Sequence, residues 1–170
     1  MDTRPILKDA YERINEGVHR VTDGLDESAL NWRPDADANS ISWLVWHLLR
    51  VQDHHVSHLA GTEQAWTGEG WADRFDMDAD PEDHGYGHTS EQVAAVRIAD
   101  PQLLCDYADA VNAGTLRYID GLDADELDRI VDTRWDPPVT AGVRLVSVIG
   151  DDLQHIGQAA YARGLYERKT

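Results

Sequence analysis

Asp151 and His155, one helical turn apart near the C-terminal end of the sequence, have the spacing of metal ligands. Side chains four residues apart on a helix leave the same face about 5–6 Å from one another. A carboxylate and an imidazole in this arrangement can hold one edge of a divalent ion, and a third ligand must come from another helix. His47 is the best donor, because it lies in the apolar stretch I-S-W-L-V-W-H-L-L-R, where a polar group needs a reason. The sequence therefore predicts a metal site formed by His47, Asp151 and His155.

Each of these residues also has a purely structural interpretation. A histidine on the inner half of a helix is often a hydrogen-bonded core residue, and Asp151 could satisfy His155 without an ion. Asp152 could replace Asp151, although it points about 100° further round the helix. No catalytic residue beyond the ligands is indicated: a G-x-S-x-G elbow is absent, and Gly85-Tyr86-Gly87 lacks the strand, lysine and serine of a nucleotide site.

The charge balance favours small-molecule partners. The 170 residues include 15 Lys and Arg and 32 Asp and Glu, which gives a net charge of −17. Such a field repels phosphate backbones and anionic membrane surfaces. We therefore expect a small-molecule substrate, with no nucleic acid and no membrane as partner.

Length and cysteine usage indicate one domain, residues 1–170, in the cytoplasm. A chain of this length can bury a substantial core as one domain. The single cysteine, Cys105, cannot form an internal disulfide, which fits a reducing compartment. The start lacks the apolar run of a signal peptide, and no segment approaches the roughly eighteen apolar residues of a membrane span.

Four long stretches carry apolar residues at intervals of three and four, the pattern of amphipathic helices. The expected helices run from Thr3 to about Gly24, from Ser40 to about Ala60, from Pro101 to about Asp120, and from about Thr140 to about Arg168. The inner stripe of the last one is expected to be Leu145, Val146, Ile149, Leu153, Ile156, Ala160 and Leu165. With no convincing strand pattern, the sequence predicts an all-α, antiparallel four-helix bundle, a fold that builds metal sites between facing helices.

The connection between the second and third long helices is unusually long. Residues 61–89 contain five glycines and several aromatic residues, which is typical of packed lids and binding segments. We expect this loop to cross one end of the bundle, followed by a short helix over residues 90–96. Residues 26–39 are expected to form a turn and a loop.

Three motifs point to a known family: N-S-I-S-W-L-V-W-H-L-L-R-V-Q-D-H-H, G-Y-G-H-T-S-E-Q-V-A-A-V-R and D-D-L-Q-H-I-G-Q-A. Together they resemble the actinobacterial branch of the DinB/YfiT-like superfamily over nearly the whole chain. The resemblance implies a four-helix bundle, often a homodimer, in which three histidines bind zinc or nickel. One is on the second helix and two form an i,i+4 pair on the last, the later one followed by Gly-Gln. His47 and His155 match the first and last, and Asp151 stands at the middle position.

The carboxylate at the middle position makes a two-histidine, one-carboxylate set, which also suits iron and manganese. The resemblance extends to thiol-dependent S-transferases and to the N-terminal domain of mycothiol-dependent maleylpyruvate isomerase, in which the metal activates the thiol. Two functions follow as hypotheses. The first is a metal-dependent transferase that uses a low-molecular-weight thiol such as mycothiol. The alternative is a non-catalytic stress-response or interaction protein, with or without bound metal.

Three further residues could contribute to the site. Arg50, one turn from His47, is the nearest basic group that could offset the acidic surface if the thiol is anionic. His54 lies two turns from His47 on nearly the same line, and His88 could face the site from the long loop. A partly exposed, non-functional position is the alternative for both histidines.

Overall fold

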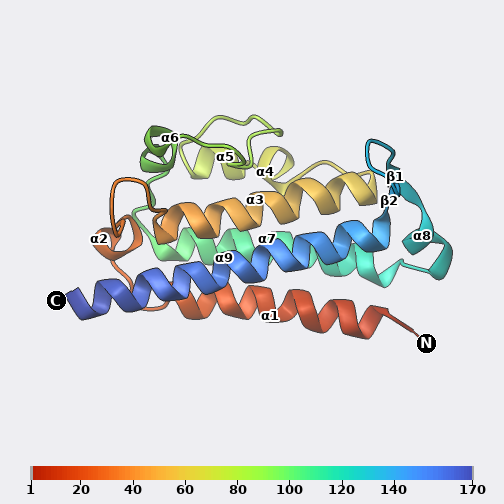
Figure 1. Ribbon diagram of the computed structural model, residues 1–170, viewed down its shortest axis with the longest axis horizontal. Helices are drawn as coiled ribbons and strands as arrows, with labels where there is room; N and C mark the ends of the chain where they lie inside the picture. Colours follow the sequence, from red (N-terminus) through yellow and green to blue (C-terminus); the bar gives the residue numbers. More distant parts are fainter. Residues whose placement is uncertain (1, 170) are drawn as a thin grey trace.

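Four long helices form a bundle in the computed structural model, which describes residues 2–169 (Figure 1). They are α1 (Arg4–Thr22), α3 (Ile41–Ala60), α7 (Pro101–Asp120) and α9 (Ala141–Lys169). Both α1 and α3 pack against α7 and α9. The predicted all-α four-helix bundle is confirmed, with helix ends close to those expected.

Local capping explains where the helices begin and end. The Ser40 hydroxyl accepts a hydrogen bond from the Trp43 amide at 3.1 Å and so caps the start of α3. Gly61 ends that helix in the left-handed conformation, with φ of 66°. Asp100 caps α7 through the Gln102 amide, and Pro101 occupies the first turn, where its missing N–H has no cost.

The directions of the helices follow from one long crossover. In Figure 1, α1 and α9 run towards the end of the molecule that carries the C-terminus, whereas α3 and α7 both run the other way. The contacting pairs α1–α7 and α3–α9 are therefore antiparallel. The pair α3–α7 is parallel, because residues 61–100 return along the whole length of α3 before α7 begins.

The crossover lies along the outer side of α3 rather than across one end of the bundle, so that expectation was wrong (Figure 1). It contains α4 (Ala65–Gly68), α5 (Trp71–Arg74) and α6 (Ser90–Ala95), the last close to the expected short helix. Arg50 holds it in place. This side chain is fully buried and donates to the backbone carbonyls of Asp80, Pro81 and Asp83 at 3.2–3.3 Å.

Short elements complete the connections. The expected loop at residues 26–39 begins with a single turn, α2 (Glu27–Leu30), and α8 (Ala124–Asp128) follows α7. An antiparallel hairpin pairs β1 (Ile130–Asp132) with β2 (Val139–Thr140), although no strand was expected. These strands are too short to produce a visible alternation. Across residues 2–169, no helix is long and apolar enough to cross a membrane.

The core lies between the four long helices. On α9, the residues that are buried are not all those predicted to face the core. Leu145 and Ile156 of α9 are buried as expected. Val146 and Leu153, placed on the same inner stripe by their spacing, are instead 64% and 49% exposed. The helix has apolar residues on two faces, so periodicity alone assigned these two to the wrong side.

Candidate metal centre

His47 on α3 meets Asp151 and His155 on α9, and each offers one ligand atom within 4.8 Å of the other two. Nε2 of His47 lies 3.9 Å from Oδ2 of Asp151, and Nε2 of His155 lies 3.6 Å from Oδ1 of the same carboxylate. The two imidazole rings are nearly perpendicular, with centroids 4.7 Å apart. The structure thus brings together the three residues that the sequence singled out.

Both imidazoles are oriented by hydrogen bonds on their far side. The Nδ1 of His47 donates to the backbone carbonyl of His84. The Nδ1 of His155 donates to Oε1 of Gln158 at 2.9 Å, which gives the Gly-Gln sequence after His155 a physical role. Because both partners are acceptors, Nε2 of each ring is the atom left to face Asp151. Such outer hydrogen bonds fix the tautomer and orientation of ligand histidines.

The protonation states suit a cation at this point. Burial lowers the pKa of His47 to about 4, so this ring is neutral at pH 7. Burial also lowers the pKa of His155, but hydrogen bonds with Asp151 and Gln158 outweigh it and the net shift is upward. The hydrogen bond from His155 lowers the pKa of Asp151. A positive charge between His155 and Asp151 is therefore favoured.

A further observation supports a divalent ion at these residues. Oδ2 of Asp151 is buried and has no hydrogen-bond partner. A desolvated carboxylate oxygen without a donor is costly, and a cation would satisfy it. Two imidazole nitrogens and a carboxylate suit zinc, nickel, iron or manganese, with positions left for other ligands.

The crossover segment closes one side of this triad. The Trp43 ring stacks on His47 with centroids 4.7 Å apart and meets His155 edge-on at 6.3 Å. Gly85 has φ of 88°, and a Cβ there would lie 3.0 Å from Nδ1 of His47. Only glycine allows the segment to approach so closely. The Asp151 side chain is 39% exposed, so access is from its side.

Other candidates lie elsewhere. Asp152 is fully buried, and burial raises its pKa well above the usual range, so it is no substitute for Asp151. His88 accepts from Nε1 of Trp43 and contacts Asp83, and His54 contacts the carbonyl of Pro81. Neither histidine belongs to the group whose ligand atoms converge.

Arg50 does not serve as the basic group of the site, because it is buried and its donors hold the crossover segment. Arg144 of α9 is also engaged, because its guanidinium donates to Asp132 at 3.3 Å. Burial and then Arg144 lower the pKa of His55 to about 3.

His84 was missed by the sequence reasoning. Its carbonyl accepts the hydrogen bond that orients His47, and its ring lies 5.2 Å from His54 and 6.3 Å from His55. The only signal was its place beside Gly85 in a glycine-rich, aromatic segment. Nothing in its spacing relates it to His47, since the contact depends on how the crossover packs.

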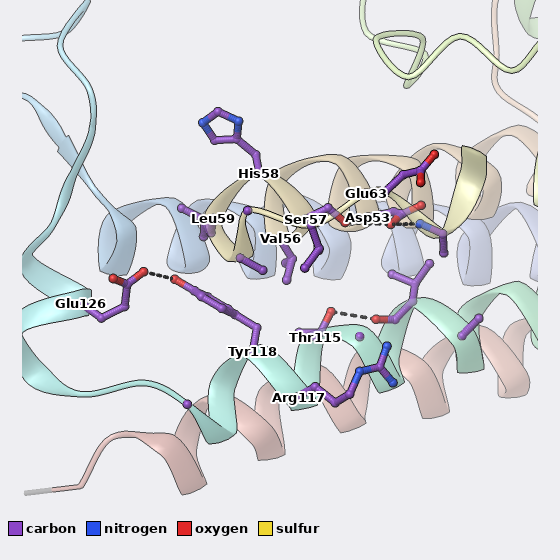
Figure 2. Close-up of a pocket in the computed structure, with 18 of the residues that line it drawn as sticks. Asp53, Val56, Ser57, His58, Leu59, Glu63, Thr115, Arg117, Tyr118 and Glu126 are labelled. Atoms are coloured by element: carbon purple, nitrogen blue, oxygen red, sulfur yellow. Dashed lines mark hydrogen bonds between the residues drawn. The ribbon is translucent and has the colours of Figure 1, made fainter. Parts of the chain in front are cut away.

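A large groove of about 1090 Å³ lies at another place, between the C-terminal half of α3, α7 and α8 (Figure 2). Several of its polar groups already have partners within the protein. The Tyr118 hydroxyl donates to Glu126 at 2.9 Å, the Thr115 hydroxyl to the Val111 carbonyl at 2.9 Å, and Asp53 accepts from the Ala65 amide at 3.0 Å. Size favours this groove as a binding site, but the unpartnered Asp151 oxygen and the three converging ligand atoms favour the triad as the place of chemistry.

Fold and triad together define a DinB-like helical bundle protein. The model of the family described as Mycothiol-S-transferase matches residues 6–168, and the chain belongs to this family. It is similar to the crystal structure of a conserved protein from Enterococcus faecalis, with 34% identity over 96% of each chain and a TM-score of 0.88. A search of the curated proteins found no match. The family resemblance seen in the three sequence motifs is confirmed.

Proposed function

We propose that the protein is a metal-dependent transferase that joins a low-molecular-weight thiol, with mycothiol as the first candidate, to a small electrophile. His47, Asp151 and His155 hold the ion, with zinc or nickel as the first candidates and iron or manganese as alternatives. The observation that carries the proposal is the convergence of three ligand atoms within 4.8 Å in a chain of the mycothiol S-transferase family.

The reaction breaks the S–H bond of the thiol and forms a bond between sulfur and an electrophilic carbon. The leaving group departs with its electron pair, and the thiol proton passes to solvent. A divalent ion in this site would lower the pKa of the thiol and so favour the nucleophilic thiolate at neutral pH.

The protein's own residues prepare this step by orientation and by exclusion of water. Gln158 and the carbonyl of His84 fix the two imidazoles. Trp43 and Gly85 close the site on the side of the crossover. Substrate then enters beside the partly exposed Asp151.

The test is turnover of mycothiol with chlorodinitrobenzene or maleylpyruvate, with bacillithiol as a second thiol. Metal-loaded wild-type protein should show thiol-dependent turnover that a chelator abolishes and added zinc or nickel restores. Asp151→Ala should lack it, whereas Gln154→Ala, an exposed position on the same helix, should retain it.

Two outcomes would overturn the proposal. Absence of turnover with every thiol and electrophile, in protein that holds about one ion per chain, would favour the non-catalytic metal-binding protein. Turnover that survives both chelation and Asp151→Ala would place the chemistry outside the triad.

A further inference from the structure

A cleft of about 520 Å³ lies between α3 and the crossover segment, apart from the triad and from the large groove. It is lined by Trp46 of α3, Trp66 of α4, and residues of and after α5 and α6, which lie beside α3 in Figure 1. Trp43 separates this crossover cleft from the triad, because it stacks on His47 and donates to His88, which lines the cleft. The cleft and the triad share no residue.

The floor of the crossover cleft holds a buried donor without an acceptor. Trp46 is 1% exposed, and its Nε1 has no hydrogen-bond partner. The indole of Trp66, by contrast, donates to the carbonyl of Asp78 at 3.2 Å. A Cβ at Gly85 would lie 2.9 Å from Cζ3 of Trp46, so the opposite edge of the ring, with Nε1, points away from the triad. Because a buried N–H without an acceptor is costly, this edge favours a ligand that brings one.

The rim of the cleft is acidic and has no cation of its own. Asp73, Asp76 and Asp78 line it, and within residues 2–169 none of their carboxylates takes part in a hydrogen bond or an ion pair. No Lys or Arg lines the cleft. His88 is neutral there, because its Nδ1 accepts the hydrogen bond from Trp43. Unpaired carboxylates on one rim attract a positively charged group.

The spacing of these carboxylates suits an organic cation better than a metal ion. Among the described residues, three ligand atoms of His, Cys, Asp or Glu converge within 4.8 Å only at the triad. An ammonium or guanidinium group has several N–H donors that point in different directions, so it can bridge carboxylates that do not converge. Arg50 lies 4.6 Å from the Trp66 ring but does not line the cleft, and its donors are held by Gln64 and by backbone carbonyls.

We propose that the crossover cleft binds a small organic cation that also carries a neutral hydrogen-bond acceptor, such as a monoacylated diamine or an amino-acid amide. The acceptor oxygen takes the N–H of Trp46, and the cationic end lies between Asp73, Asp76 and Asp78. The chain that joins the two ends contacts Met77, the apolar residue of the rim. The acceptor is neutral because the acidic rim repels a carboxylate. The volume lies within the range of small-molecule sites.

The first measurement is calorimetric titration of the full chain at pH 7 with N-acetylputrescine, which has an amide at one end and an ammonium at the other. Two matched probes each lack one end: N-butylacetamide has no ammonium, and butylamine has no amide. N-acetylputrescine should bind with a dissociation constant of about 1 mM or below, and each matched probe at least about tenfold more weakly. Calcium chloride alone should give no binding signal at the cleft.

Charge-removing variants locate the site. The combined variant Asp73→Asn, Asp76→Asn and Asp78→Asn should weaken binding of N-acetylputrescine at least about tenfold, because it removes the charge of the rim. Its circular dichroism should be unchanged, since these carboxylates make no contact within the described chain. Asp80→Asn is the matched control, an exposed position in the same segment that does not line the cleft. Asp80→Asn and Asp151→Ala should both leave binding unchanged.

The second measurement follows the floor of the cleft by NMR of the tryptophan indole N–H groups. The Trp46 signal, assigned by its loss in Trp46→Phe, should move downfield when N-acetylputrescine binds and should move less with butylamine.

Several results would overturn the proposal. They are absence of binding by N-acetylputrescine, equal binding of N-butylacetamide, binding of calcium in place of the amine, and an unchanged Trp46 signal at saturation. Equal weakening by Asp80→Asn and by the combined rim variant would reduce the effect to general electrostatics. Loss of binding in Asp151→Ala would move the site to the triad.

Discussion

The triad of His47, Asp151 and His155 and the large groove both include residues of α3, yet they offer different contacts to a ligand. The groove has about 1090 Å³ of space, and Tyr118, Thr115 and Asp53 in it are hydrogen-bonded within the protein. The triad has an unpartnered carboxylate oxygen and two oriented imidazoles. A buried polar atom without a partner is rare in a folded protein. An unsatisfied atom that also converges with oriented ligand atoms is therefore a better guide to chemistry than cavity volume.

The strongest test of this comparison is removal of a ligand. Asp151→Ala or His155→Ala should reduce zinc or nickel affinity at least about 100-fold, because two ligands cannot hold the ion as three do. Metal content by plasma mass spectrometry, on protein purified without a histidine tag, checks this. Wild type should hold about one ion per chain. Asp151→His should retain binding, as the three-histidine pattern of the family implies, and its failure would show that the carboxylate is specifically required.

The pH dependence of metal affinity gives the next largest effect. The pKa of His155 is raised above its ordinary value of 6.5, so a proton must leave this ring before an ion binds. Affinity should fall about tenfold for each pH unit below that pKa. His47, with a pKa of about 4, should compete only in stronger acid. Titration with zinc from pH 8 to pH 5 checks the slope, and a flat profile would contradict the assignment of His155.

A smaller change is expected from the residue that orients His155. Gln158→Leu removes the acceptor for Nδ1 and should weaken metal binding about tenfold, whereas Gln158→Glu keeps an acceptor and should bind at least as tightly as wild type. The pKa of His155, followed by NMR in the metal-free protein, should fall in Gln158→Leu. If that pKa falls and metal affinity does not, Gln158 has no part in the site.

The sequence was sufficient to predict which three side chains converge, because their signal is local or unusual. Asp151 and His155 are related by one helical turn, and His47 is a polar residue in an apolar stretch. Local signals also gave the long helices, whose caps are next to the residues they cap. His84 could not be found in this way, because its contact with His47 depends on how residues 61–89 pack on α3.

The exposed face of α9 shows a different limit. Val146 and Leu153 have the spacing of core residues, and periodicity cannot tell which of two apolar faces points inward. Gly150 and Gly157 lie towards this exposed face, and a Cβ added at either position would meet nothing within 4 Å. The apolar residues of α9, which form one broad stripe in the sequence, therefore divide into a buried face and an exposed face.

The smallest effect is expected from a substitution in the groove. This substitution tests whether the triad, and not the groove, is the place of chemistry. Tyr118→Phe removes the hydrogen bond to Glu126 but keeps the ring, so unfolding free energy should fall by about 1 kcal/mol or less at this half-buried position. Metal affinity and turnover should be unchanged, because the groove shares no residue with the triad. Urea denaturation and the thiol assay measure the two quantities, with Tyr161→Phe as an exposed control. If Tyr118→Phe lowered turnover tenfold with stability and metal content intact, the groove would bind substrate, and cavity size would have been the better guide after all.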